Sequence, residues 1–100
     1  MKKTEEELTA NILNAMAHPN RIRILEKLKQ SPLCNCELMP LLNLEQSNLS
    51  RHLNILVNAG VIISWRDGTR VNYKIADDKI LTILAAATQI ATGSSEKQVN

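Results

Sequence analysis

Apolar residues recur at helical spacing in four stretches of the first sixty residues. The clearest stretch is 45–59, where Leu49, Leu53 and Leu56 follow one another as in the buried stripe of an amphipathic helix. The other predicted helices cover 4–17, the segment from Pro19 to the break at Ser31-Pro32, and 35–42. In the second and third helices the positions expected to face inward are Ile22, Leu25, Leu28, Leu38, Leu41 and Leu42, and those expected to face outward are Arg21, Arg23, Lys27 and Lys29.

Capping residues mark where these helices begin and end. Thr4 and Glu7 have the spacing of a capping box, and Pro19 suits the first turn of the second helix. Asn43 and Gly60 stand where the third and fourth helices should stop in a left-handed conformation. The third and fourth helices are therefore joined by very few residues.

After Gly60 the hydrophobic pattern changes to a period of two, which is typical of strands. Val71, Tyr73 and Ile75 alternate with polar residues, and the preceding segment VIISW supplies a partner strand. Asp67-Gly68 between the strands is a strong hairpin signal. A last helix is expected over 77–92, and the tail 93–100 is expected to be disordered. The chain is thus predicted to be one mainly α domain, 1–92, in the order helix, helix, helix, helix, strand, strand, helix.

Composition supports a helical domain with a polyanionic partner. One hundred residues with 44% hydrophobic content and only two aromatic residues, Trp65 and Tyr73, suit packed helices better than a sandwich or barrel. Between His18 and Ala76, eight Lys or Arg stand against four Asp or Glu, so the excess of positive charge lies in the middle of the chain. No apolar run could span a membrane and no secretory signal opens the sequence, which favours the cytoplasm.

The helix at 45–59 has a polar front suited to reading DNA. Its leucines anchor it from behind, while polar side chains of its first two turns can reach base edges in a major groove. Arg can donate two hydrogen bonds to guanine, and Asn or Gln can bind adenine in the same bidentate way. The candidate DNA-binding residues of this helix are Gln46, Ser47, Asn48, Ser50, Arg51 and His52.

Two cations flank the tight turn of the hairpin. Arg66 and Arg70 stand on either side of Asp67-Gly68, which would place both at the tip of a projecting wing, beside phosphate or the minor groove. Each feature alone has an ordinary explanation, a solvated helix face or a charged edge hairpin. The two features in this order favour a DNA-binding module with a recognition helix and a wing.

Several segments resemble the ArsR/SmtB family of winged-helix metalloregulatory repressors. They are AHPNRIRILEKL, LCNCELMPLL, EQSNLSRHLNILVNAGVI and RDGTRVNYKI, and they lie between Ala15 and Ile80. The resemblance implies a winged helix-turn-helix homodimer that represses transcription from double-stranded operator DNA and leaves it when an effector binds. It also implies that helices 4–17 and 77–92 pair across a two-fold axis, and that DNA binding requires no cofactor.

The same resemblance gives a role to Cys34 and Cys36, the only cysteines in the chain. Arsenic- and cadmium-responsive members of the family carry a C-x-C at the start of the helix before the recognition helix, so the likeness implies that this pair binds metal. Soft thiolates suit As(III), Sb(III) or another thiophilic ion as inducer. Arsenic sensors often have a third cysteine where this chain has Met39, so the third ligand and the inducer stay open.

Other interpretations also stay open. The cysteine pair could respond to oxidation or persulfide without metal, or could serve packing alone. A winged-helix module of a different class would bind protein rather than DNA. An enzyme is not indicated, because the sequence has no Gly-rich phosphate loop and no paired carboxylates in a plausible cleft. His18, ahead of Pro19, is expected to be a cap or surface residue rather than a ligand.

Overall fold

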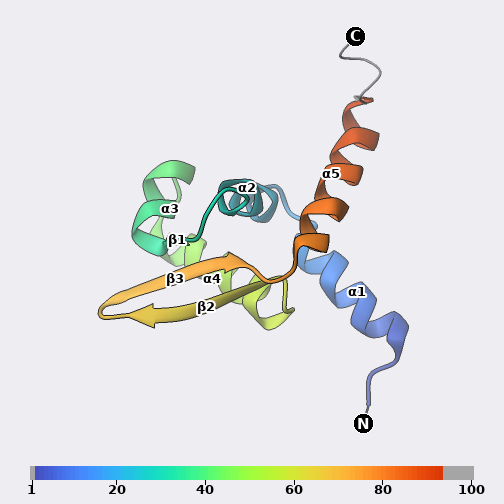
Figure 1. Cartoon of the computed structure of the whole chain (residues 1–100), viewed down its shortest axis with the longest axis horizontal. Coiled ribbons are helices and arrows are strands. Elements are labelled where there is room, and N and C mark those ends of the chain that lie inside the picture. Colours follow the sequence, from blue (N-terminus) through green and yellow to red (C-terminus); the bar gives the residue numbers. More distant parts are fainter. Residues whose placement is uncertain (1, 94–100) are drawn as a thin grey trace.

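The computed structural model describes residues 2–93 of the chain and contains five helices and three strands. The elements are α1 (Glu5–Met16), α2 (Pro19–Leu28), β1 (Leu33–Cys34), α3 (Asn35–Leu42), α4 (Gln46–Asn58), β2 (Ile62–Asp67), β3 (Arg70–Ile75) and α5 (Asp78–Thr92). Figure 1 shows α1 and α5 at one end of the long axis and the tip of the β2–β3 hairpin at the other. The predicted fold class is confirmed. The expected disordered tail lies, apart from Gly93, outside the described residues.

The helix ends follow the predicted capping signals. Thr4 and Glu7 form a capping box, in which each side chain accepts a hydrogen bond from the other residue's backbone N–H, at 3.1 and 3.0 Å. His18 caps α2 through its Nδ1, which accepts from the backbone N–H of Asn20 at 3.0 Å. Asn43 ends α3 with a φ of 54°, in the left-handed region. Local chemistry along the sequence therefore marks where these helices begin and end.

The core lies between α2, α3, α4 and the base of the hairpin. Its fully buried side chains include Ile24, Leu25, Leu38, Leu42, Leu49, Leu53, Leu56, Val61 and Ile62. Two predicted inward positions are wrong, because Ile22 is 37% and Leu41 is 50% exposed. The buried side of α2 passes through Ile24 instead, and Ile22 turns toward α1 and α5. On α3, Leu38 and Leu42 are four residues apart and both lie on the inner face, whereas Leu41 lies outside it.

The sheet has one strand more than the pattern predicted. β1 pairs antiparallel with β3, opposite the edge that carries β2, so that the strand order is β1-β3-β2. Leu33 lies opposite Tyr73, and Cys34 lies opposite Asn72. β1 was missed because two residues are too few to show an alternation of polar and apolar positions. The cysteine segment is consequently hydrogen-bonded to the hairpin.

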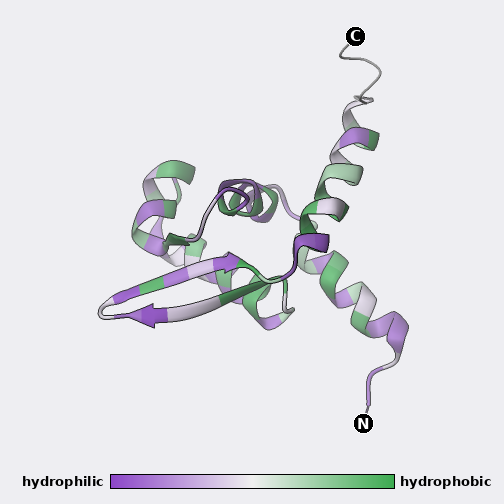
Figure 2. Ribbon diagram, in the orientation of Figure 1, coloured by the Kyte–Doolittle hydropathy of each residue, from purple (hydrophilic) through white to green (hydrophobic). Residues whose placement is uncertain are grey.

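An apolar surface extends over α1 and α5. Leu13, Met16, Ala17, Ile22, Ile83, Leu84 and Ala87 line a hollow between α1, α2 and α5. Further along α5, Ile90 is 83% exposed. Figure 2 shows hydrophobic stretches along both helices, whereas the region around the hairpin tip is hydrophilic. Solvated apolar area of this extent marks an interaction surface rather than a monomer's outer face.

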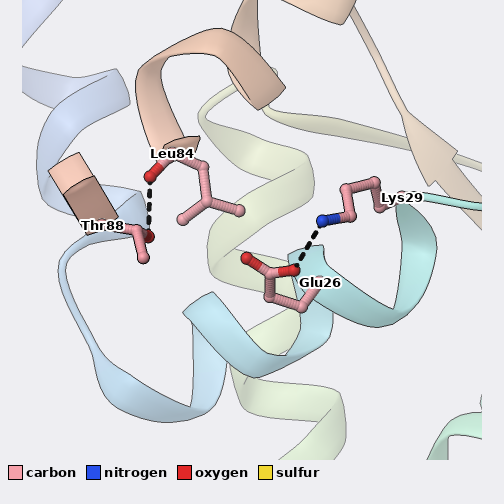
Figure 3. A network of polar contacts seen from close by, with 4 residues as sticks. All are labelled: Glu26, Lys29, Leu84 and Thr88. Atoms are coloured by element: carbon pink, nitrogen blue, oxygen red, sulfur yellow. Dashed lines mark hydrogen bonds and ion pairs between the residues drawn. The ribbon is translucent and has the colours of Figure 1, made fainter. Parts of the chain in front are cut away.

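The first turns of α5 rest beside the end of α2. Leu84 is buried there, close to an ion pair between Glu26 and Lys29 at 3.1 Å (Figure 3). Thr88 Oγ1 donates to the carbonyl of Leu84 at 2.8 Å, so the threonine satisfies its hydroxyl within the helix.

No helix of the described residues is long and apolar enough to cross a membrane.

Candidate nucleic-acid interface

A short turn joins α3 to α4 and limits how the two helices can be oriented relative to each other. The turn comprises residues 43–45, and its first residue, Asn43, is the left-handed end of α3. Arg23 of α2 donates from Nη2 to the carbonyl of Leu42 at 2.7 Å, which satisfies a backbone oxygen at the open end of α3. The helix-turn-helix is thus fastened to the rest of the domain by a side chain that the sequence pattern assigned to solvent.

The leucines of α4 hold it against the core while its front faces solvent. Leu49, Leu53 and Leu56 are buried at 1% exposure or less. Of the six polar residues predicted to read DNA on this helix, five are exposed, namely Gln46, Ser47, Asn48, Ser50 and Arg51. Arg51 Nη2 donates to Asn48 Oδ1 at 2.9 Å, so the arginine is oriented before any DNA contact. This arrangement suits a helix that enters a major groove.

His52 does not belong to this exposed face, and the prediction that it contacts DNA is corrected. Its side chain is only 1% exposed. It lies 4.5 Å from the ring of His18, centroid to centroid, and within 3.1 Å of Arg21 Nη1. The reason is helical geometry, because a residue three positions after Leu49 lies on the same side of the helix. The polar residue types around His52 do not indicate its burial, but its spacing from Leu49 does.

Asn54 is an exposed polar residue that the sequence analysis did not single out. It is four residues after Ser50 and three after Arg51, and so continues their side of α4 by one turn. Helical periodicity applied to the polar residues, as it was to the leucines, would have identified it. The exposed front of α4 therefore runs over three turns rather than two.

The two wing cations lie on opposite faces of the hairpin. Arg66 lies opposite Val71, and Arg70 lies opposite Asp67. Side chains alternate along a strand, so Arg66 shares the face of Tyr73, and Arg70 the face of Trp65. Burial raises the pKa of the Tyr73 phenol, and the charge of Arg66 partly offsets that rise. Both arginines are exposed, so they extend from the tip in two directions.

Cys34 and Cys36 are joined in a disulfide across the start of α3. Cys34 ends β1 and is fully buried, whereas Cys36 lies in the first turn of α3 and is exposed. The Glu37 carboxylate accepts from the backbone N–H of Cys34 at 2.8 Å and closes the same turn. Met39, at the position of the missing third cysteine, is half-buried and packs against the core.

The predicted metal ligands therefore form an incomplete donor set in this form. A disulfide offers no thiolate, and two thiolates arise here only after reduction. Among residues 2–93, no group of three or more His, Cys, Asp or Glu side chains could hold a metal ion. Within the described part of the chain, a thiophilic ion bound to the reduced pair would find no third His, Cys, Asp or Glu ligand.

Comparisons with known proteins agree with this geometry. The model of the family "bacterial regulatory protein, arsR family" matches residues 18–64. The HTH-type transcriptional regulator Rv0081 of Mycobacterium tuberculosis is 41% identical over 85 residues, which cover 84% of this chain and 75% of that protein. Its crystal structure superposes with a TM-score of 0.79 and 36% identity over 99% of this chain and 100% of that chain.

Two further similarities are more distant. A probable mercury resistance operon repressor of Streptomyces lividans is 25% identical over 92% of this chain and 74% of its own length. A homodimeric winged helix-turn-helix DNA-binding domain of Mycobacterium bovis shares the fold, with a TM-score of 0.79 at 22% identity over 90% of this chain and 88% of that chain. The chain therefore belongs to the arsR family of bacterial regulatory proteins, and it is a DNA-binding regulator of transcription with a winged helix-turn-helix fold, not an enzyme.

Proposed function

We propose that this protein is a transcriptional repressor that binds operator DNA as a homodimer and is released through its cysteine pair. The observation that carries the proposal is the exposed polar front of α4 beside a projecting hairpin with an arginine on each face. Base-edge contacts from Ser47, Ser50 and Arg51 would give sequence specificity, and the wing would neutralise phosphate. Such a regulator would act in the cytoplasm.

The apolar surface of α1 and α5 supports the homodimer. It carries Leu13, Ile83 and Ile90, which are exposed in the single chain and would be covered by the same helices of a second copy. The M. bovis domain of the same fold is homodimeric. A two-fold dimer would present its recognition helices about 34–36 Å apart, one turn of DNA, and would require a palindromic operator.

The position of Cys34 and Cys36 supports their role as the effector site. Both sit at the N-terminal end of α3, the helix that supports α4, so a change of bonding at the pair would act on the DNA-reading helix. In the reduced state they would offer two soft thiolates to As(III), Sb(III) or another thiophilic ion. The similarity to a mercury resistance repressor supports a thiophilic inducer.

A second candidate effector is thiol oxidation. The disulfide between Cys34 and Cys36 favours it, because the two sulfurs are bonded to each other and residues 2–93 offer no third ligand that would complete a metal site. In this case the reduced and oxidised forms would differ in affinity for the operator, and no metal would be required. The same two residues would serve either effector.

The experiment is a titration of fluorescent DNA from the protein's own promoter, followed by anisotropy, with the reduced homodimer. Arg51→Ala should abolish the preference for this DNA over a scrambled sequence, whereas Lys27→Ala, which removes an exposed cation of α2, should not. Equal preference in wild type and Arg51→Ala would contradict the assignment of α4.

The effector is then identified by testing which compound releases the protein from DNA. As(III), Sb(III), Cd(II), Zn(II) and a mild disulfide oxidant are added separately to the preformed complex. Release by a thiophilic ion under reducing conditions supports metal sensing, and release by the oxidant alone supports thiol sensing. The double variant Cys34→Ser, Cys36→Ser should bind DNA and respond to neither. A normal response of this variant would refute the role of the pair.

A further inference from the structure

Arg21 connects three helices through one guanidinium group. It lies in the first turn of α2 and is half-buried. Its Nε donates to the carbonyl of Ala15 in the last turn of α1 at 2.6 Å. Its Nη1 lies 3.1 Å from Nδ1 of His52 on α4. Because the guanidinium is planar and rigid, these two contacts fix α1 and α4 relative to each other.

The contact with His52 has a defined direction. A guanidinium can only donate, so Nδ1 of His52 must be the acceptor and the ring proton must sit on Nε2. The imidazole is therefore neutral when the contact forms. A second proton, on Nδ1, would remove the acceptor and place a cation against Arg21.

The surroundings of His52 keep it neutral. Its pKa is lowered from 6.5, first by burial and then by the charges of His18, Arg51 and Arg21. Arg21 lies at the N-terminal end of α2, His18 is the cap of that helix, and Arg51 lies on α4 itself. The other elements that pack on α4, namely α1, α3 and β2, add no titratable group to this set. None of the ion pairs among residues 2–93 involves His52 or Arg21, so no carboxylate compensates a charge there.

We propose that Arg21 is a positioning residue that sets the recognition helix against the dimer helix α1, and that operator affinity depends on the neutral form of His52. The inference rests on the proposed function, because it assumes that α1 joins the two subunits and α4 reads DNA. The contacts of Arg21 with Ala15 and His52 then set the distance between the two recognition helices of a dimer. Protonation of His52 breaks its contact with Arg21, so that α4 is no longer held against α1, and lowers the affinity for paired half-sites.

The first test compares substitutions at Arg21 by anisotropy with the protein's own promoter DNA. Arg21→Met, which keeps the stem and removes both donations, should weaken operator binding about ten- to hundred-fold, as the loss of a charge-assisted hydrogen bond does. Arg21→Lys should restore part of this loss, since an ammonium can satisfy one acceptor but not both. Lys27→Met is the charge-matched control on α2 and should change binding less than about three-fold.

The second test remains decisive if Arg21→Met fails to fold. Operator affinity of the wild type should fall as the pH is lowered through the pKa of His52, which burial and neighbouring charges hold below 6.5. His52→Asn places an amide oxygen near the position of Nδ1 and cannot gain a proton, so its affinity should stay constant over this range. His18→Asn keeps an N-cap acceptor but removes a charge that lowers the pKa of His52, so the pH dependence should persist with its midpoint moved to higher pH.

Three results separate this inference from the proposed function. If the wild type shows no preference for its promoter DNA, the proposed function fails. If the wild type binds but His52→Asn follows the same pH profile, the role of His52 is overturned. Operator binding by folded Arg21→Met within about two-fold of the wild type would overturn the role of Arg21.

Discussion

Cys34 of β1 lies directly opposite Asn72 of β3, and Asn72 lies opposite Trp65 of β2. Directly opposed residues of antiparallel strands project from the same face, so the three residues form one row across the sheet, about 10 Å from end to end. The cysteine pair is therefore connected to two parts of the candidate DNA-binding surface. It begins α3, which supports α4, and it is hydrogen-bonded through β1 to the wing.

Reduction of the disulfide should change the fluorescence of Trp65. Trp65 is the only tryptophan, is 41% exposed, and has the Lys74 ammonium 5.9 Å from its ring centroid. Release of Cys36 from Cys34 frees β1 to shift against β3, and this row carries the change to Trp65. The measurement is the emission spectrum before and after addition of a phosphine reductant.

The matched control for this prediction is the variant Cys34→Ser, Cys36→Ser. Its emission should not respond to the reductant, because it contains no disulfide. Identical spectra of the oxidised and reduced wild type would show that the strand β1 does not transmit the change to the wing.

Two leucines of α3 should differ in their contribution to stability. Leu38 is fully buried, and Leu38→Ala should lower the free energy of unfolding by about 2–5 kcal/mol through lost burial and the cavity left behind. Leu41 is 50% exposed, and Leu41→Ala should cost less than about 1 kcal/mol. Urea unfolding at equal protein concentration measures both, since association of the subunits also stabilises the fold. Equal losses would mean that Leu41 is covered in the assembled protein.

The same pair of leucines shows what the sequence could and could not predict. The boundary signals at Thr4, Pro19 and Asn43 act locally, so helix boundaries followed from neighbouring residues alone. The side of α3 that faces the core depends on where α2 and β3 pack, and no local pattern contains that information. For the same reason Ile22, whose neighbours lie on α1 and α5, was assigned to the wrong apolar surface.

The candidate site was predictable to a similar degree. Five polar residues of α4 were identified because a solvated front follows from the leucine stripe. His52 was grouped with them although its spacing of three residues from Leu49 places it on the buried side of α4; its contact with Arg21, thirty-one residues earlier in the chain, could not be predicted. β1, too short to have a period, is the element that links Cys34 to the wing. Contacts over long sequence separation therefore account for the missed strand β1 and the missed contact of His52 with Arg21, whereas helical spacing would have shown the exposure of Asn54.

Stability should depend on pH through His52. The folded-state pKa is lowered below 6.5, so above this pH the imidazole is neutral in both the folded and unfolded states and its full contribution is present. As the pH falls from 6.5 through the lowered pKa, the unfolded state takes up the proton first and stability decreases. Thermal unfolding of the wild type between pH 7.5 and 5 measures this effect. His52→Asn should show a smaller decrease of Tm over the same range, and an equal decrease would assign the effect to other groups.

The two wing arginines should contribute separately to DNA binding. Arg66 and Arg70 extend from opposite faces of the hairpin tip, so a wing at the DNA backbone can place them on different phosphates. Arg66→Ala and Arg70→Ala should each reduce the slope of log affinity against log salt concentration by about 1, and the double variant by about 2. Neither should change the preference for promoter over scrambled DNA, in contrast to Arg51→Ala. Binding measured at four salt concentrations gives the slopes, with Lys27→Ala as control. If only one of the two substitutions lowers the slope, the wing contacts DNA with one face rather than with its tip, and the unaffected arginine identifies the face that remains in solvent.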